Sequence, residues 1–501
     1  MAILDVLLQS FSLASLLGAL AVLLLIYFMF SNFTSQKEPP GPTPLPLIGN
    51  LLQIDLKRPY KTYLEYSRKY GSVFKVHFGP KKVVVLAGYK TVKEALVNHD
   101  DVFGGRDSLK LLHEVNKGQG VLWANGDSWR EMRRFALTNL RDFGMGKKAC
   151  ENKIVEECQQ LIDIFKAFKG EAFDANLVVN RAVSNIICSM VYGNRFEYDD
   201  PVFTALVSQL NTIIQLSGSP SVLLSNLIPW VSKFTRGRKK FFDLISVSRK
   251  NNVALLNNVK ETLNPQMCRG FIDAFLVRKQ QQEESGITNS HFNEQNLLVT
   301  VSNLFNAGTE TTSTTIRWGF LFMAKYPKIQ DQVQEEIRSV IGDRQVQVAD
   351  RTNLPFTNAV IHETQRLGSI VPNSLPHKTN KDITFHGYFI KKGTTVYPCL
   401  TSVLYDPTEW EKPHTFYPAH FLDKDGNFIK RDAFMPFSAG SRACLGESLA
   451  KMELFIFFTT LLQHFRFTPP PGVSEDELDL TPCGGITVGP TPQKLCAVPR
   501  M

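Results

Sequence analysis

The pattern of apolar and polar positions predicts a mostly helical chain with short strands near its beginning and its end. Strand-like runs occur at Val73–Phe78, Lys82–Leu86, Ile383–Ile390, Gly393–Tyr397 and Leu480–Val498. The first two are separated by Gly79-Pro80, which predicts a hairpin. From about Trp129 to Leu367 the periodicity is mainly helical. The predicted fold class is therefore mainly α with a minor β portion.

One predicted helix is unusually long. The segment Asn293–Tyr326 contains no proline and is followed by Pro327, so a single helix is expected there. Its centre holds a glycine and several β-branched threonines, which are poor helix formers. The Thr311 hydroxyl can donate to the Ala307 carbonyl oxygen and open a small polar notch in an apolar wall. A threonine-rich buried helix without a further role is the alternative interpretation.

The N-terminal segment differs sharply from the rest of the chain. No charged residue lies between Asp5 and Lys37, and Phe11–Phe30 is apolar and long enough to cross a bilayer. The acidic start and the length of the run are untypical of a cleaved signal peptide, so we expect a retained membrane anchor over 1–36. The basic residues that follow it predict that the body of the protein faces the cytosol.

A proline-rich segment follows the predicted anchor. The run Pro39–Pro46 is stiff and extended and cannot form a helix. We expect residues 37–50 to act as a hinge that holds the remaining chain at a fixed distance from the membrane. No linker, repeat or low-complexity tract interrupts residues 51–501, which predicts one large domain.

The composition is that of an ordinary globular protein, with 43% hydrophobic and 21% charged residues. The net charge of +9 is modest and scattered, so nucleic acid is not an expected partner. The eight cysteines are widely spaced and form no CxxC pair. That spacing is typical of a reducing compartment and argues against a disulfide framework or a zinc site.

The strongest chemical signal is a single cysteine in the run Phe437–Gly446. Cys444 precedes an apolar, helix-like run from Leu445 to Phe465. A thiolate at a helix N-terminus feels the positive end of the helix dipole and the nearby backbone N–H groups. We therefore expect the ionised form of Cys444 to be favoured.

The neighbours of the cysteine point to a flat, acidic ligand. Gly440 and Gly446 would allow the backbone to turn tightly and to approach such a ligand closely. Arg442 can bind a carboxylate through two hydrogen bonds. A single axial thiolate with a carboxylate clamp is what a haem held through its iron and its propionates needs. A buried structural cysteine in a glycine-rich turn is the alternative.

This segment resembles the haem-binding signature of the cytochrome P450 family. The five matching positions are Phe437, Gly440, Arg442, Cys444 and Gly446. The resemblance implies the fold of that family, haem b (iron protoporphyrin IX) as the cofactor, and Cys444 as the metal ligand. It also implies a haem-dependent monooxygenase that inserts one atom of O2 into its substrate. The anchor and hinge are similar to those of the microsomal family-two branch, which implies the endoplasmic reticulum membrane with the catalytic domain on its cytosolic face.

The resemblance extends to residues far from the cysteine. The centre of the long helix resembles the family's oxygen-activation groove, in which Thr311 would hold the iron-bound oxygen and water and Glu310 would help to deliver protons. Glu363 and Arg366 resemble the family's Glu–Arg pair, which locks the core behind the haem. The usual third partner is an arginine, but His420 stands at that position here, so the third contact is left open.

Further donors to the haem propionates are implied by the same resemblance. Trp129 and Arg133 lie four residues apart on one helix face, and both side chains are good donors to a carboxylate. The resemblance implies that both bind a propionate. Arg106 and His377 stand where the microsomal branch has two more propionate ligands. A surface arginine or an ordinary polar core histidine is the alternative at each position.

Electrons must come from a separate protein, because the chain shows no flavin or nicotinamide signature. The resemblance implies NADPH–cytochrome P450 reductase, with cytochrome b5 as a second candidate. Acidic partners would dock on a basic face formed by Arg130, Arg134, Arg141, Lys147, Lys148, Lys430 and Lys451. Ser219–Phe234, beside the basic run Arg236–Lys240, predicts a second, shallow contact with membrane lipid. An ordinary core helix is the alternative there.

The substrate site is predicted by analogy with the family. Its walls would come from Leu109–Val121, Leu304–Thr311, Ile370–Leu375 and Cys483–Ile486. These segments are mostly apolar, so a small lipophilic substrate is expected, and a fatty acid, a steroid or a xenobiotic would each fit. Two other functions stay open: a haem-thiolate isomerase or dehydratase that uses preformed peroxides, and a non-catalytic haem carrier or sensor. The Glu310-Thr311 pair argues against both.

Overall fold

The computed structural model describes residues 15, 18–20, 22, 37–108, 110–217, 222 and 236–500. The predicted anchor over 1–36 and the predicted lipid-contact segment 219–234 lie almost wholly outside these residues. Among the helices within the described ranges, none combines the length and the apolar character needed to cross a membrane.

Helices make up most of the described chain, as the apolar periodicity predicts. The α-helices are α3 (Pro59–Tyr70), α4 (Tyr89–Lys93), α5 (Asp100–Phe103), α6 (Lys110–Asn116), α7 (Gly126–Asp142), α8 (Lys148–Ala167), α9 (Asn176–Val191), α10 (Pro201–Ser217), α13 (Arg236–Glu261), α14 (Phe271–Glu284), α15 (Glu294–Lys325), α16 (Pro327–Val340), α17 (Pro355–Gly368), α18 (Leu400–Leu404) and α19 (Glu447–His464). Shorter helical turns are η1 (Leu51–Gln53), η2 (Glu94–Asn98), η3 (Val348–Asn353), η4 (Pro418–Phe421), η5 (Gly440–Arg442) and η6 (Glu475–Glu477).

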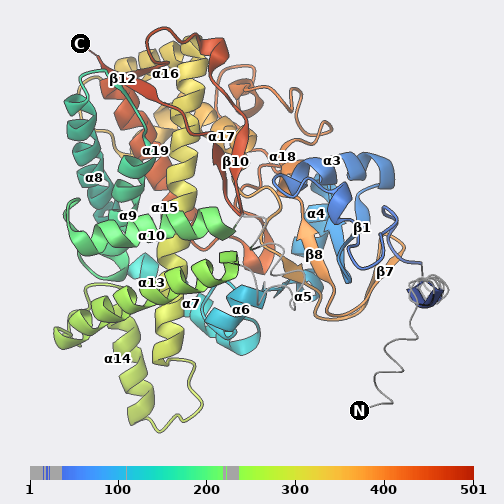
Figure 1. Cartoon of the computed structure of the whole chain (residues 1–501). Helices are drawn as coiled ribbons and strands as arrows, with labels where there is room; N and C mark the ends of the chain where they lie inside the picture. Colours follow the sequence, from blue (N-terminus) through green and yellow to red (C-terminus); the bar gives the residue numbers. More distant parts are fainter. Residues whose placement is uncertain are drawn as a thin grey trace.

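The strands form small sheets, and the largest of them lies at one side of the molecule (Figure 1). The strands are β1 (Val73–Phe78), β2 (Lys81–Leu86), β3 (Gly105–Arg106), β4 (Ala172–Phe173), β5 (His377–Lys378), β6 (Ile383–Phe385), β7 (Tyr388–Ile390), β8 (Thr395–Pro398), β9 (Phe465–Thr468), β10 (Pro482–Gly484), β11 (Val488–Pro490) and β12 (Leu495–Pro499). The largest sheet has the order β1-β2-β8-β5-β3. The predicted hairpin of β1 and β2 is confirmed.

The strand signal at Ile383–Ile390 resolves into two strands instead of one. β6 and β7 pair in an antiparallel hairpin. His386 and Gly387 between them have positive φ values of 50° and 77°, which suit the tight turn that the right-handed twist of two strands requires. The remaining strand predictions, at Gly393–Tyr397 and in Leu480–Val498, correspond to β8 and to β10, β11 and β12.

The predicted long helix is α15, which runs through the middle of the helical part (Figure 1). It begins after Asn293, whose side chain accepts the Asn296 N–H, and it ends before Pro327, as predicted. Gly308 in its centre faces α9, where an added Cβ would lie 2.6 Å from Ile187 Cδ1. Close packing of α15 on the Ile187 side chain of α9 therefore favours glycine at this position, at the expense of intrinsic helix propensity.

The proline-rich hinge packs along the largest sheet. The Glu38 carboxylate lies 2.7 Å from the Nζ atoms of both Lys75 and Lys82, and the Lys75 N–H donates to the Pro40 carbonyl oxygen at 2.7 Å. Partial burial acts to raise the pKa of Glu38, but hydrogen bonds from the two lysines outweigh it and lower that pKa to about 2. The beginning of this proline-rich segment, which is predicted to act as a hinge, is thus fixed relative to the sheet.

Candidate active site

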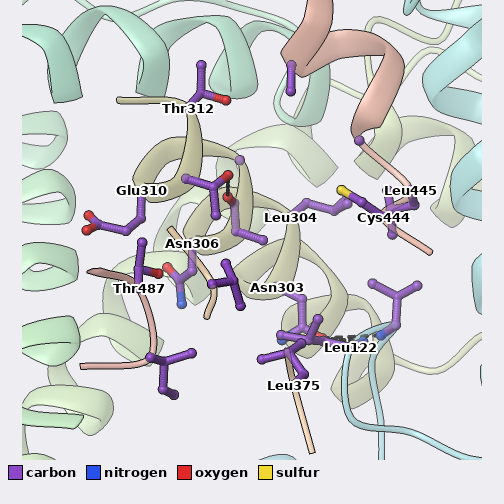
Figure 2. Close-up of a pocket in the computed structure, with 18 of the residues that line it drawn as sticks. Leu122, Asn303, Leu304, Asn306, Glu310, Thr312, Leu375, Cys444, Leu445 and Thr487 are labelled. Carbon is purple, nitrogen blue, oxygen red and sulfur yellow. Dashed lines mark hydrogen bonds between the residues drawn. The ribbon is translucent and has the colours of Figure 1, made fainter. Parts of the chain in front are cut away.

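A cavity of about 390 Å³ lies between the middle of α15 and the loop that precedes α19. Its wall is mostly apolar, and each of the four segments predicted for the substrate site contributes to it within the described residues. Figure 2 shows Cys444 facing this space from one side, with Leu304, Asn306 and Glu310 of α15 on the other. Eight of the candidate catalytic and cofactor-binding residues thus line one cavity, whereas His377 and Gly440 are not among its lining residues.

Cys444 ends a tight loop that begins at Phe437. The Cys444 N–H donates to the Phe437 carbonyl oxygen at 3.0 Å, and both residues line the cavity. Gly440 has a φ of 74°, and a Cβ there would lie 1.9 Å from the Leu96 carbonyl oxygen. The close approach that Gly440 permits is therefore to the η2 turn. This differs from the expectation that the glycine brings the backbone against a flat ligand, and Gly440 is not among the lining residues.

The Cys444 sulfur opens into the cavity, while the surrounding protein encloses it. Burial raises the pKa of the Cys444 thiol above its ordinary value, whereas the N–H groups of Gly446 and Glu447 lower it. The helix-end effect expected from the sequence is present, but burial outweighs it in the chain alone. A metal cation bound to the sulfur would reverse this balance, because a ligating thiol is deprotonated.

Four buried polar atoms near the cysteine loop have no hydrogen-bond partner among the described residues. They are Trp129 Nε1, Arg106 Nε, His377 Nε2 and Arg442 Nη1. These are four of the side chains predicted from the sequence to bind propionates, and they come from distant parts of the chain: α7, β3, β5 and η5. Buried polar groups are normally paired, so this convergence indicates a place for an acceptor group such as a carboxylate.

The rest of the Arg442 side chain is held firmly. Its guanidinium lies over the Trp129 ring, with 3.5 Å between Cζ and the ring centroid. Arg442 Nε donates to the Gly104 carbonyl oxygen at 2.8 Å, and Nη2 donates to the Ala124 carbonyl oxygen at 3.0 Å. These contacts leave Nη1 as the donor available to an anion.

Arg106 and Arg133 add positive charge to the same place. Arg106 Nη1 donates to the Leu375 carbonyl oxygen at 3.0 Å, and Arg133 Nη2 donates to the Ala443 carbonyl oxygen at 2.6 Å. Burial, reinforced by mutual repulsion, lowers the pKa of Arg106 and Arg442. Among the described residues, Arg106, Arg133 and Arg442 form no salt bridge. A bound anion would therefore offset the free-energy cost of burying their charges.

His377 is committed to a single tautomer. Its Nδ1 lies 2.7 Å from the Phe103 carbonyl oxygen, which can only accept, so Nδ1 carries the proton of the neutral ring. Burial and then the Arg106 guanidinium lower the pKa of His377 well below its ordinary value. Nε2 donates to a carboxylate only in the charged form, which an adjacent anion would favour.

Thr311 makes the hydrogen bond predicted from the sequence. Its Oγ1 donates to the Ala307 carbonyl oxygen at 2.7 Å. The Glu310 carboxylate accepts from Thr314 at 3.2 Å and points away from Cys444 in Figure 2. Burial raises the pKa of Glu310, against the opposing effects of Arg317 and the Thr314 hydrogen bond. A protonated carboxyl group is thus available beside the cavity at higher pH than for an exposed glutamate.

The Glu–Arg pair predicted behind the site is fully buried. Arg366 and Glu363 make two hydrogen bonds of 2.7 Å, and both side chains are 0% exposed. His420 Nδ1 lies 3.2 Å from the second oxygen of Glu363, so the contact left open by the sequence is present. Because His420 Nε2 accepts the Lys412 N–H, Nδ1 is the protonated nitrogen and donates to Glu363. A neutral histidine therefore takes the third place in this cluster.

Two features of the cavity were missed in the sequence. Glu453, in the apolar helix α19, lines the cavity, is 1% exposed and has an unpaired Oε1. Burial raises the pKa of Glu453 to about 8. A lone carboxylate inside an apolar helical run was the available signal. Asn303 also lines the cavity, and its side chain bonds the backbone of a neighbouring loop. The only signal for this role in the sequence is that Asn303 lies at helical spacing from Thr311.

The family model of cytochrome P450 matches residues 39–497 of this chain. The chain belongs to the cytochrome P450 family. Cytochromes P450 2K1 and 2K4 of Oncorhynchus mykiss are each 59% identical to it, over all of this chain and all of their own length. Cytochrome P450 2J2 of Homo sapiens is 43% identical and matches 97% of this chain and 96% of its own. These relatives place the chain in family 2.

Membership of this family makes the protein a haem-dependent monooxygenase with the cytochrome P450 fold. Its cofactor is haem b, and its reaction involves O2, a substrate and a redox partner. The residues present fit this cofactor: a thiol faces the cavity, and unpaired donors converge beside it. The fit to the cofactor therefore depends on the kinds of atoms that line the site, a thiol and buried polar nitrogens.

Proposed function

We propose that the protein is a membrane-bound haem-thiolate monooxygenase that oxidises small lipophilic substrates. Bound haem would supply the activation of O2 and the insertion of one oxygen atom into a carbon–hydrogen bond. Cys444 is the proposed metal ligand, and the remaining residues bind, orient and move protons. The observation that carries this proposal is the set of four buried, unpaired nitrogen atoms next to a cysteine that faces a mostly apolar cavity.

The propionates of the cofactor are assigned to the arginine-rich side of the cavity. Arg442, Arg106 and Arg133 would supply positive charge. Trp129 would add a neutral N–H donor, and His377 would donate through Nε2 when an adjacent anion favours its charged form. Phe437 and Gly440 shape the loop that presents Cys444: the first accepts its N–H, and the second allows the turn. Pairing with carboxylates would satisfy the buried donors and offset the repulsion among the arginines.

Proton delivery is assigned to Thr311 and Glu310. Thr311 Oγ1 donates to the helix backbone, so its lone pairs remain able to accept from water in the cavity. Glu310 is the proposed proton source, and burial, which raises its pKa, favours the protonated form that a donor needs. Because its carboxylate is turned toward Thr314, the proton would reach the cavity through water or after rotation of the side chain.

Electrons are proposed to come from NADPH–cytochrome P450 reductase, with cytochrome b5 as a further donor. Arg130, Arg134 and Arg141 lie on α7 and are exposed, and α7 also carries Trp129 and Arg133 of the site. A flavoprotein that docked on this basic face would therefore approach the arginine-rich side of the cavity. Electrostatic steering of an acidic partner would accelerate its association at low ionic strength.

The proposed location is the endoplasmic reticulum membrane, with the catalytic domain on the cytosolic face. It rests on the apolar N-terminal segment over 1–36 and on the hinge over 37–50, which leads into a catalytic domain over 51–501. Lipophilic substrates of the fatty acid, steroid or xenobiotic type would match the apolar cavity wall and would be concentrated in lipid.

Replacement of Thr311 by alanine tests the proposed chemistry. With reductase and NADPH, Thr311→Ala should lower product per NADPH about tenfold or more and release hydrogen peroxide, because the general-acid path is broken. Thr309→Ala is the matched control, since Thr309 is buried two residues away on the opposite face of the helix and bonds Ser184 outside the cavity. Equal coupling in wild type and Thr311→Ala, or equal loss in both variants, would remove Thr311 from the proton path.

A further inference from the structure

The loop between α6 and α7, residues 117–125, supplies one wall of the cavity. Val121, Leu122 and Trp123 all line it. The loop pairs with no strand, so its buried backbone N–H groups need acceptors from other parts of the chain. The position of this cavity wall therefore depends on which groups accept the hydrogen bonds of those N–H groups.

Two asparagines of α15 provide the acceptors. Asn296 and Asn303 are seven residues apart, which places them on one face of the helix. Asn296 Oδ1 accepts the Gly120 N–H at 2.7 Å. Asn303 Oδ1 accepts the Val121 and Leu122 N–H groups at 3.2 and 3.1 Å (Figure 2). Three consecutive amides of the loop are thus held by two side chains.

Gly120 shows how close this approach is. It has a φ of 87°, and a Cβ there would lie 2.5 Å from Asn303 Oδ1 and 2.6 Å from Val299 Cγ1. Both the backbone conformation and the space favour glycine. The contact between loop and helix therefore leaves no room for a side chain.

The other end of the loop is tied to the arginine-rich side of the cavity. Arg442 Nη2 donates to the Ala124 carbonyl oxygen and to Asn125 Oδ1, each at 3.0 Å. Asn125 Oδ1 also accepts the Arg106 N–H at 2.7 Å. The wall formed by Val121 to Trp123 is thus held between α15 and the cofactor side.

We propose that Asn303, assisted by Asn296, is a positioning residue that sets the regioselectivity of the enzyme. By fixing Val121 and Leu122, it determines which carbon of a lipophilic substrate is presented for oxidation. This inference rests on the proposed function. Asn303 acts through the loop, because its oxygen is engaged by two backbone amides.

Removal of the acceptor is the direct test. Asn303→Leu keeps the approximate size but leaves two amides without a partner, so hydrogen exchange at Val121 and Leu122 should accelerate about tenfold or more. With a homologous series of n-alkylbenzenes as probe substrates, the ratio of positional alcohols should shift about threefold or more. Asn303→Asp keeps an acceptor oxygen in the same place and should restore slow exchange.

Asn185→Leu is the matched control. Asn185 is 0% exposed and does not line the cavity. Its Nδ2 donates to the Phe196 carbonyl oxygen at 2.8 Å, and its Oδ1 accepts the Phe196 N–H at 2.9 Å. This variant should lose stability and keep the wild-type alcohol ratio. If Asn303→Leu does not fold, Gly120→Ala disturbs the same contact from the loop side and should produce the same shift in alcohol ratio.

The outcomes separate this inference from the proposed function. Fast exchange with an unchanged alcohol ratio would make the clamp purely structural and overturn the proposal, as would an equal shift in Asn185→Leu. Unchanged exchange in Asn303→Leu would also overturn it. No product from wild-type protein would count against the proposed function, while the exchange measurement, which needs no turnover, would still test the clamp.

Discussion

Two of the buried, arginine-containing clusters among the described residues differ in how their charges are satisfied. Behind the site, Arg366 is 0% exposed and bonds Glu363 through two hydrogen bonds, and the remaining donors of Arg366 bond backbone carbonyl oxygens. Beside the cavity, Arg106 and Arg442 are each 6% exposed, and each keeps an unpaired nitrogen. The first cluster is complete within the chain, and the second is complete only with an added anion.

This difference separates a structural role from a binding role. Desolvation of a charge costs free energy in both clusters. Only in the first cluster is this cost offset by partners from the same chain, namely the Glu363 carboxylate and backbone carbonyl oxygens. A site that binds an anionic cofactor instead keeps its donors in position before the cofactor arrives. Mutations in the two clusters should therefore have opposite signatures in stability and in cofactor retention.

The largest effect is expected at Glu363. Glu363→Ala leaves the Arg366 guanidinium buried without its carboxylate and also removes the acceptor of His420. We expect a loss of about 3–5 kcal/mol in the free energy of unfolding, because an unpaired buried charge is strongly destabilising. Urea denaturation followed by circular dichroism measures it.

Glu335→Ala is the matched control for this prediction. Glu335 and Arg338 have the same i, i+3 spacing and the same 2.7 Å separation, but their side chains are 63% and 68% exposed. Removal of Glu335 should leave the free energy of unfolding almost unchanged, because solvent screens surface pairs. Similar losses in the two variants would contradict the importance of burial.

The second effect is expected at Trp129 and has the opposite character. Trp129→Phe removes the unpaired Nε1–H together with part of the indole, which lines the cavity, and keeps an aromatic ring beside Arg442. The stability of the haem-free protein should stay within about 0.5 kcal/mol of wild type or rise. Haem binding should weaken by about 1.5–3 kcal/mol, the range for a hydrogen bond to a charged group. Transfer of haem to apomyoglobin measures its retention.

Trp318→Phe is expected to have the reverse effects on stability and on haem retention. Trp318 Nε1 donates to the Val488 carbonyl oxygen at 3.3 Å, so this indole is already satisfied within the chain. Its replacement should lower stability by about 1–3 kcal/mol, since a buried carbonyl loses its donor, and leave haem retention unchanged. Equal haem loss in the two variants would show that the unpaired indole has no special role.

The smallest effect in acidic solution is expected at Glu453. Its folded-state pKa of about 8 lies above the unfolded value of about 4.5, and glutamine is a neutral near-isostere of the protonated group. The folded protein binds this proton more tightly than the unfolded chain, so the resulting stability is fully present below about pH 4.5 and is lost as pH rises from there through about 8. Glu453→Gln should therefore match wild type at pH 4 and become steadily more stable than wild type between pH 5 and pH 8, as thermal unfolding would show. Parallel profiles would contradict a raised folded-state pKa of Glu453.

Local features of the site could be predicted from the sequence because they depend on neighbours in the chain. The β1–β2 hairpin, the limits of α15 and the Thr311–Ala307 bond all follow from periodicity, proline and side-chain reach. The ionisation of Cys444 was less predictable. The helix end acts as expected, but burial depends on the packed fold and outweighs it.

Contacts between distant segments required the structure. The Glu363–His420 hydrogen bond joins residues 57 positions apart. The loop held by Asn303 lies 181 or more positions before it in the chain. Candidate propionate ligands could be proposed from family resemblance, but only the fold shows that their unpaired nitrogens converge. Such convergence has no periodic signature in the chain.

The most direct test of the central claim is the carbon monoxide difference spectrum of the reduced, purified full-length protein. A thiolate from Cys444 on haem iron predicts the shifted absorption band of thiolate ligation, and Cys444→Ala should lose that band. A folded wild-type protein that takes up no haem, or that binds haem and gives no such band, would contradict the assignment of Cys444 and of the donors around it.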